Sequence, residues 1–371
     1  MIKPLTSLRF LFALMVFGDH LQFFDFAQYP EFKEWHYRII GEGFIGVSFF
    51  FILSGFILSL NYDTRLLSRK VSFREFWVAR FARVYPLHLF TLLLALLLVA
   101  QSTETISDFF VNPVLSTTTF LSNVALIQSF IPDPAYFFAY NAPAWSISDE
   151  MFFYFAFPFI VSLFVRNKAL LRFGMVLFLA IPALMYLSTE ASLHPYLYIN
   201  PFFRIVDFIL GITLHQVYKH NYFTRLYKST VGATVLELLS VGAFVAVFSY
   251  HNDVPVLYRY SCFYWVPMAM VIFSFAYQGG YLSKVLSNNF LVLLGEISFS
   301  FYLIHQLVIR FLLEKNGEYS FTDNNYVLTA IMFLLSLGLS YLMHIYIELP
   351  CNHYIKRKYK ERSMLAPETV A

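Results

Sequence analysis

Arg9 and His20 are the residues of this chain whose types and spacing most clearly suggest chemistry. Both lie in an apolar stretch from Leu5 to about Phe24, which is long enough to span a bilayer. Ionisable side chains are costly at that depth and tend to mark a substrate path or an active site. Helical geometry puts the two on one face, roughly 16 Å apart along the axis. The spacing predicts a cation for an anionic group and an imidazole for proton transfer. A snorkelling arginine and a histidine bonded within the bundle are the structural alternative.

Other polar residues of the predicted spans fall into two layers. The predicted inner layer holds Arg9, the basic loop 65–83 and Glu348. The predicted outer layer holds His20, the start of the Trp145–Glu150 span, Asn200, Arg204, Asp207, Tyr302 and His305.

Several of these residues have two interpretations. Arg80 and Arg83 share a helical face and suit either an interfacial helix or a phosphate grip. Glu150 could complement a helix dipole or orient an imidazole. The stripe of Ser298, Tyr302 and His305 could serve interhelical hydrogen bonds alone. Close helix packing is the default interpretation of Ser54–Gly55.

Composition indicates a membrane protein. Of 371 residues, 58% are hydrophobic and only 13% are charged, against about 25% charged in soluble domains. A net charge of +3 gives no indication of nucleic-acid binding, because loop topology explains the basic residues. Two cysteines, Cys262 and Cys351, exclude a disulfide framework. We expect no cleavable signal peptide.

The hydrophobic runs predict an all-α, polytopic helix bundle of about ten transmembrane helices. The run at 119–131 is short and flanked by prolines, which favours a re-entrant or interfacial segment. The excess of lysine and arginine on one side predicts that both termini are cytoplasmic. We expect one membrane domain, 1–350, and a cytoplasmic tail, 351–371, that is loose after Tyr359. The predicted spans are 5–24, 44–60, 84–101, 150–166, 169–187, 202–218, 231–250, 262–277, 290–313 and 327–348.

Together these segments resemble the membrane acyltransferase family 3, bacterial integral-membrane O-acyltransferases of surface polysaccharides. The resemblance covers most of the chain from Leu5 to Pro350, and Asp207 stands where the family more often has Glu. We expect no appended extracytoplasmic hydrolase-like domain of the kind that some members carry. The matching motifs are Arg9 with His20, Phe50–Phe56, Arg80 and Arg83 with Pro86, Trp145–Tyr154, Ser298–His305, and Glu348 with Pro350.

The resemblance implies transfer of an acyl group, with acetyl as the expected one, from cytoplasmic acyl-CoA to a hydroxyl of an extracytoplasmic or lipid-linked glycan. Acyl-CoA is then the donor substrate, no metal is expected, and the protein is multi-pass in the bacterial cytoplasmic membrane. A transporter or flippase for a glycan or lipid-linked sugar is the alternative. A structural polymerase subunit is a third interpretation, which needs neither activity nor His20.

The same resemblance implies roles for individual residues. His20 is the expected general base, oriented by Glu150, and an acyl-histidine intermediate stays open. His305 would position the acceptor or stabilise an oxyanion. The residues expected to bind substrate are Arg9, Arg80 and Arg83 at the phosphates, and Ser54, Trp145, Ser148, Arg204 and Tyr302 elsewhere.

Overall fold

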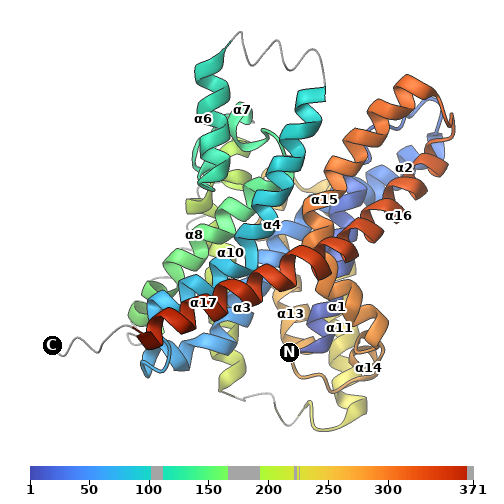
Figure 1. Ribbon diagram of the computed structural model, residues 1–371. Coiled ribbons are helices and arrows are strands. Elements are labelled where there is room, and N and C mark those ends of the chain that lie inside the picture. Colours follow the sequence, from blue (N-terminus) through green and yellow to red (C-terminus); the bar gives the residue numbers. More distant parts are fainter. Residues whose placement is uncertain (102–111, 166–192, 221–223, 225, 366–371) are drawn as a thin grey trace.

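The protein is all-helical over the residues that the structure, a computed structural model, describes: 1–101, 112–165, 193–220, 224 and 226–365. Long helices dominate, and α15 and α16 run side by side from the upper right of Figure 1. The α-helices are α1 (Lys3–Asp19), α2 (Pro30–Arg38), α3 (Gly46–Leu67), α4 (Phe73–Gln101), α6 (Pro113–Val124), α7 (Pro134–Phe137), α8 (Trp145–Ile160), α10 (Pro201–Lys219), α11 (Thr230–Ser249), α12 (Val256–Arg259), α13 (Trp265–Ala276), α14 (Tyr281–Leu286), α15 (Asn289–Tyr319), α16 (Asn325–Met343) and α17 (Leu349–Leu365).

Six helical segments within these ranges are long and apolar enough to cross a membrane. They are Pro30–Leu67, Phe73–Leu98, Ala142–Leu163, Thr230–Ser249, Asn289–Tyr319 and Asn325–Ser363. The helix of α1 has 17 residues and the apolar segment Cys262–Ala276 is shorter still. The predicted span 169–187 lies outside the described residues. An all-helical fold with six candidate membrane-spanning helices among the described residues is therefore confirmed, while the count of ten spans and the side of the termini stay predictions.

Asparagine side chains begin several of these helices. The Oδ1 atoms of Asn200, Asn288 and Asn324 accept hydrogen bonds from backbone N–H groups two residues later, at 2.9–3.0 Å. Such caps satisfy amides that the first helical turn leaves unpaired. The starts of α10, α15 and α16 are thereby fixed by single polar residues at the edge of apolar runs.

Two expectations about helix boundaries are corrected. The segment around Arg80 is no separate interfacial helix, because α4 continues from Phe73 through Pro86 to Gln101. Residues 360–365, just after Tyr359, are helical rather than loose, because α17 continues to Leu365. This helix packs on α4, and the guanidinium of Arg74 lies 5.8 Å from the ring centroid of Tyr359. Lysine, arginine and glutamate favour helix, which is why the polar composition of 360–365 did not make this part loose.

Glycines let α1 approach its neighbours at backbone distance. A Cβ on Gly43 or Gly295 would lie 1.9 Å from a carbonyl oxygen of α1, that of Met15 or Thr6. Small residues allow such close helix contacts in membrane proteins. These contacts hold α1 between η1 (Ile40–Ile45) and α15, which fixes where Arg9 and His20 lie.

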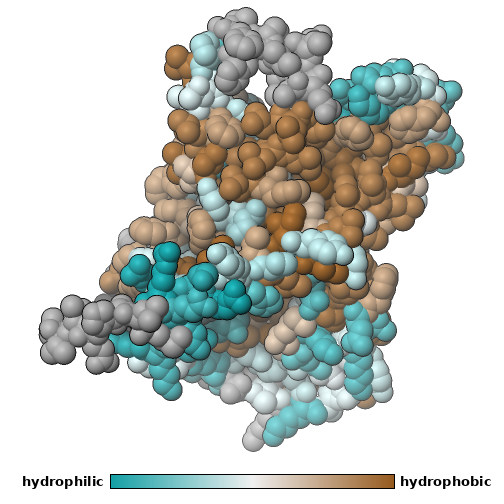
Figure 2. Space-filling view, viewed as in Figure 1, coloured by the Kyte–Doolittle hydropathy of each residue, from teal (hydrophilic) through white to brown (hydrophobic). Residues whose placement is uncertain are grey.

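The surface agrees with a membrane location. Figure 2 shows a broad hydrophobic zone over the long helices, and hydrophilic residues gathered at α17 and at the upper right tip. The basic residues of the hydrophilic patch on α17 include Lys356, Arg357, Lys358 and Lys360. An apolar belt between polar ends is the pattern expected of a bundle surrounded by lipid.

Candidate active site

A cavity of about 610 Å³ lies beside α1, among helices α3, α4, α8 and α15. Its charged lining residues are Arg9, Arg80, Arg83, Glu150 and Glu296, and the first four are called the charged part here. Its remaining lining includes Ser54, Tyr154, Ser298, Tyr302, His344 and the apolar side chains Val47, Phe50, Phe51 and Ile147. Six of the residues that the sequence predicted to act together thus line this cavity: Arg9, Ser54, Arg80, Arg83, Glu150 and Tyr302.

Arg9 is the arginine of this cavity that is least engaged with the protein. Within the described ranges it makes no hydrogen bond and no ion pair at contact distance. Glu150 lies within electrostatic range of its guanidinium. A guanidinium presents five N–H donors in a planar fork that suits phosphates and carboxylates. Arg9 is therefore available to an anionic group that enters the cavity.

Arg80 and Arg83, predicted to act alike, differ in their partners. Arg83 pairs with Glu348, whose carboxylate is fully buried and also interacts with Ser300 and His344, each at 2.9 Å. Arg80 donates to the Tyr62 hydroxyl at 3.2 Å and lies over the ring of Tyr154. The charge of Arg83 is thus already neutralised by a buried carboxylate, whereas the charge of Arg80 is not.

Glu150 lies with Arg9 rather than with the histidines. Its Oε1 accepts from the Ser54 hydroxyl at 3.3 Å and from the Tyr154 hydroxyl. No hydrogen bond joins Glu150 to His20 among the described residues, so the expectation that it orients His20 stays a prediction. Ser146, one turn earlier on α8, reaches Tyr302 instead.

His20 and His305 meet at one end of α1. Nδ1 of His20 lies 3.3 Å from Nε2 of His305, and it also lies 2.8 Å from the carbonyl oxygen of Val16. Nδ1 of His305 contacts the carbonyl oxygen of Phe301 at 3.2 Å. His305 is fully buried, whereas His20, the C-cap of α1, is partly exposed.

The tautomer of His20 follows from these contacts. A carbonyl oxygen only accepts, so the proton of His20 is on Nδ1, which donates to Val16, and Nε2 keeps a lone pair. The imidazole that sequence spacing singled out is therefore arranged to accept a proton at Nε2.

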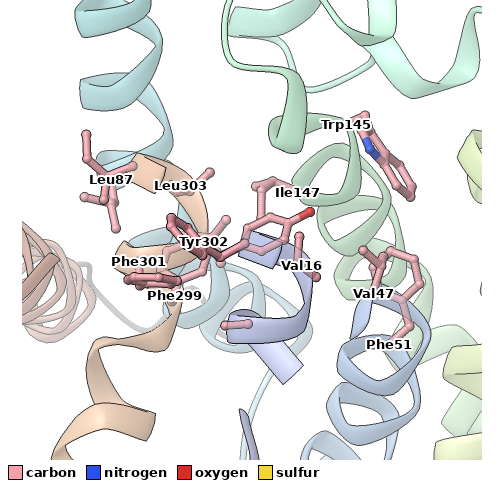
Figure 3. Close-up of a cluster of buried hydrophobic side chains, with 14 of the residues drawn as sticks. Val16, Val47, Phe51, Leu87, Trp145, Ile147, Phe299, Phe301, Tyr302 and Leu303 are labelled. Carbon is pink, nitrogen blue, oxygen red and sulfur yellow. The ribbon is translucent and has the colours of Figure 1, made fainter. Parts of the chain in front are cut away.

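Tyr302 lines the cavity and also lies beside His305. Its hydroxyl bonds Ser146 Oγ at 2.7 Å and the Pro143 carbonyl oxygen at 3.2 Å. Its ring lies 5.9 Å, centroid to centroid, from that of His305. Figure 3 labels Tyr302 together with Ile147 and Val16 in one cluster of buried hydrophobic side chains. Among the described residues that line the cavity, neither His20 nor His305 is present.

Three residues expected to bind substrate lie outside the cavity lining. Arg204 is buried and bonded to Asp207, Ser48 and the Tyr260 carbonyl. Ser148 donates to the Leu126 carbonyl oxygen at 2.6 Å. The Trp145 ring packs on Tyr198, 4.9 Å between centroids. These contacts hold α8 and α10 in place and leave the three side chains no opening to the cavity.

The sequence interpretation missed two contributors to the site. His344 lines the cavity and lies four residues before Glu348, a spacing that shares a helical face and could have indicated the pair. Tyr62 supports Arg80 from α3, and no spacing in the sequence indicated it.

Comparisons with known proteins agree with this arrangement. A family model described as an acyltransferase domain matches residues 4–345. The chain belongs to this acyltransferase family. Acyltransferase MdmB of Streptomyces mycarofaciens is 29% identical over 96% of this chain and 93% of its own. Peptidoglycan O-acetyltransferase OatA of Listeria monocytogenes is 24% identical over 83% of this chain. The chain spans about half, 49%, of OatA. No solved structure matches.

The family match confirms the resemblance found in the sequence, and the described helices include six that are long and apolar enough to cross a membrane.

Proposed function

We propose that this protein takes an acyl group from acyl-CoA, whose phosphates bind in the charged part of the cavity, and transfers it to a hydroxyl at the histidine pair. The observation that supports the proposal is that α1 presents two different functional side chains at two separate positions. At one position it presents to a cavity the guanidinium of Arg9, which has no ion-pair partner among the described residues, and at its end it presents His20 to His305.

The donor would bind through its phosphates at Arg9 and Arg80. Both guanidinium groups line the cavity, and neither has a carboxylate at contact distance among the described residues. Charge-assisted hydrogen bonds to phosphate are about twice as strong as neutral ones. Glu150, held by Ser54 and Tyr154, positions Arg9 in this scheme. Arg83, with its charge matched by Glu348, shapes the cavity wall.

His20 would act as the general base. Its Nε2 takes the proton of the acceptor hydroxyl while the hydroxyl oxygen attacks the thioester carbonyl. The tetrahedral intermediate then expels the CoA sulfur, which receives that proton from His20. His305 fixes the ring of His20 through the contact between Nε2 of His305 and Nδ1 of His20, so it is a positioning residue.

The acceptor would be a hydroxyl compound on the side of the membrane to which His20 opens. One relative is named as a peptidoglycan O-acetyltransferase, which supports a glycan as the acceptor class here. With the N-terminus cytoplasmic, the donor would come from the cytoplasm and the acceptor from outside, in a bacterial cytoplasmic membrane.

The test is release of free CoA by purified protein in detergent, given acyl-CoA with and without a soluble glycan fragment. Release that requires both the glycan and His20 supports the proposal. A protein that binds a lipid-linked sugar but consumes no acyl-CoA with any acceptor would instead support the flippase interpretation.

A further inference from the structure

Near Tyr302, which lies beside His305, the cavity is lined by apolar side chains and by two hydroxyls that bond each other. On α8, Ser146 and Ile147 precede Glu150 by about one turn, and on α15, Tyr302 precedes His305 by about one turn. The level of Tyr302 therefore lies between the charged part of the cavity and the histidines. We call Val47, Phe50, Ile147 and Tyr302 the collar.

Two kinds of contact fix the position of Tyr302: hydrogen bonds at its hydroxyl and an aromatic contact with Phe50. Its hydroxyl is bonded to Ser146 and to the Pro143 carbonyl, and Ser146 Oγ also donates to that carbonyl at 2.9 Å. The Phe50 ring meets it edge-on, 6.0 Å between centroids. Because these hydroxyls satisfy one another, the collar offers no unused polar group to a passing ligand.

The donor reaches this collar with its acyl end first. Its phosphates are held by Arg9 and Arg80 on one side, and the base His20 lies on the other. The acyl carbon must therefore pass Tyr302 before it meets Nε2 of His20. A narrow apolar passage penalises bulk through steric contact and penalises charge through desolvation.

We propose that Tyr302 selects a small, uncharged acyl group, an inference that rests on the proposed function of the same site. Tyr302 is the specificity-determining residue, because its ring borders the passage. Ser146 is a positioning residue, because it acts by holding that ring.

The test compares kcat/KM for three donors, acetyl-CoA, isobutanoyl-CoA and succinyl-CoA, which differ in bulk and in charge. The wild type should prefer acetyl over both of the others. Tyr302→Leu should raise the isobutanoyl-to-acetyl ratio at least about 10-fold, since one methylene in an apolar pocket is worth about 10–200-fold. The succinyl-to-acetyl ratio should stay within about twofold of the wild type, because the widened passage is still apolar.

Ser146→Ala tests whether the bond from Ser146 fixes the Tyr302 ring. This variant should also raise the isobutanoyl-to-acetyl ratio of kcat/KM. Tyr85→Leu is the matched control. Tyr85 lies on α4, outside the cavity lining, and its hydroxyl donates to the Val124 carbonyl oxygen. This control should leave all ratios unchanged.

Each outcome separates the two proposals. If wild-type protein consumes no acyl-CoA, the proposed function fails. If it is active but uses succinyl-CoA as well as acetyl-CoA, or if Tyr302→Leu leaves the isobutanoyl ratio unchanged, then only the role of Tyr302 is overturned.

Discussion

Three arginines line the cavity, and their different partners indicate different roles. Arg9 has no partner at contact distance within the described part of the chain. Arg80 donates a hydrogen bond to a tyrosine hydroxyl, and Arg83 forms an ion pair with the buried Glu348. Sequence spacing alone gave Arg80 and Arg83 one role, because both lie on one face of α4. Glu348 is 265 positions from Arg83, and no local pattern predicts that contact.

Arg80→Ala should weaken the binding of acyl-CoA without lowering stability. The lost charge-assisted contact is worth about 1.5–3 kcal/mol, roughly a 10- to 100-fold change in Kd. Direct binding of a labelled acyl-CoA to purified protein measures it. An unchanged Kd would mean that Arg80 serves only membrane orientation.

Arg83→Ala should instead lower stability. The substitution removes the arginine partner of the Glu348 carboxylate, and Glu348 is only 1% exposed. Breaking a buried ion pair costs about 3–5 kcal/mol of stability. The unfolding temperature in detergent should fall, and the double variant Arg83→Met/Glu348→Leu should recover most of the loss. A single variant as stable as the wild type would contradict the assignment of Arg83 to the cavity wall.

At the scale of the element, helix contacts decide which side chains face the cavity. Gly55 of α3 and Gly211 of α10 form a crossing in which an added Cβ on Gly55 would lie 2.0 Å from the Phe208 carbonyl oxygen. This agrees with the packing interpretation of Ser54–Gly55 and turns Ser54 toward Glu150. Sequence periodicity identified the helices and the face of α1. It could not predict that the carboxylate of Glu150 accepts from both Ser54 and Tyr154, because the contact with Ser54 depends on how α3 and α8 pack.

Gly55→Ala should therefore lower the yield of folded protein, because the backbones of α3 and α10 must separate. Gly242→Ala in α11 is the matched control, since nothing lies within 4 Å of its added Cβ. Size-exclusion profiles in detergent compare the two variants. Equal profiles for both would show that the crossing tolerates the methyl group.

At the scale of the whole molecule, the central prediction from sequence is orientation. Cys262 and Cys351, neither of them in a disulfide, are expected on opposite sides of the membrane. An impermeant thiol reagent added outside intact cells should not label a variant that keeps only Cys351. Labelling of that variant without cell lysis would overturn the expected topology, and labelling after lysis shows that the thiol is reactive.

The account's central claim is that α1 carries the donor site at Arg9 and the proton acceptor at His20. Measuring acyl-CoA affinity and turnover on the same preparations of Arg9→Gln and His20→Ala tests it most directly. His20→Ala should keep wild-type affinity and lose turnover by about 10²–10⁴-fold. Arg9→Gln should lose affinity by roughly 10- to 100-fold. Turnover near the wild-type level without His20, or unchanged affinity without Arg9, would contradict the account.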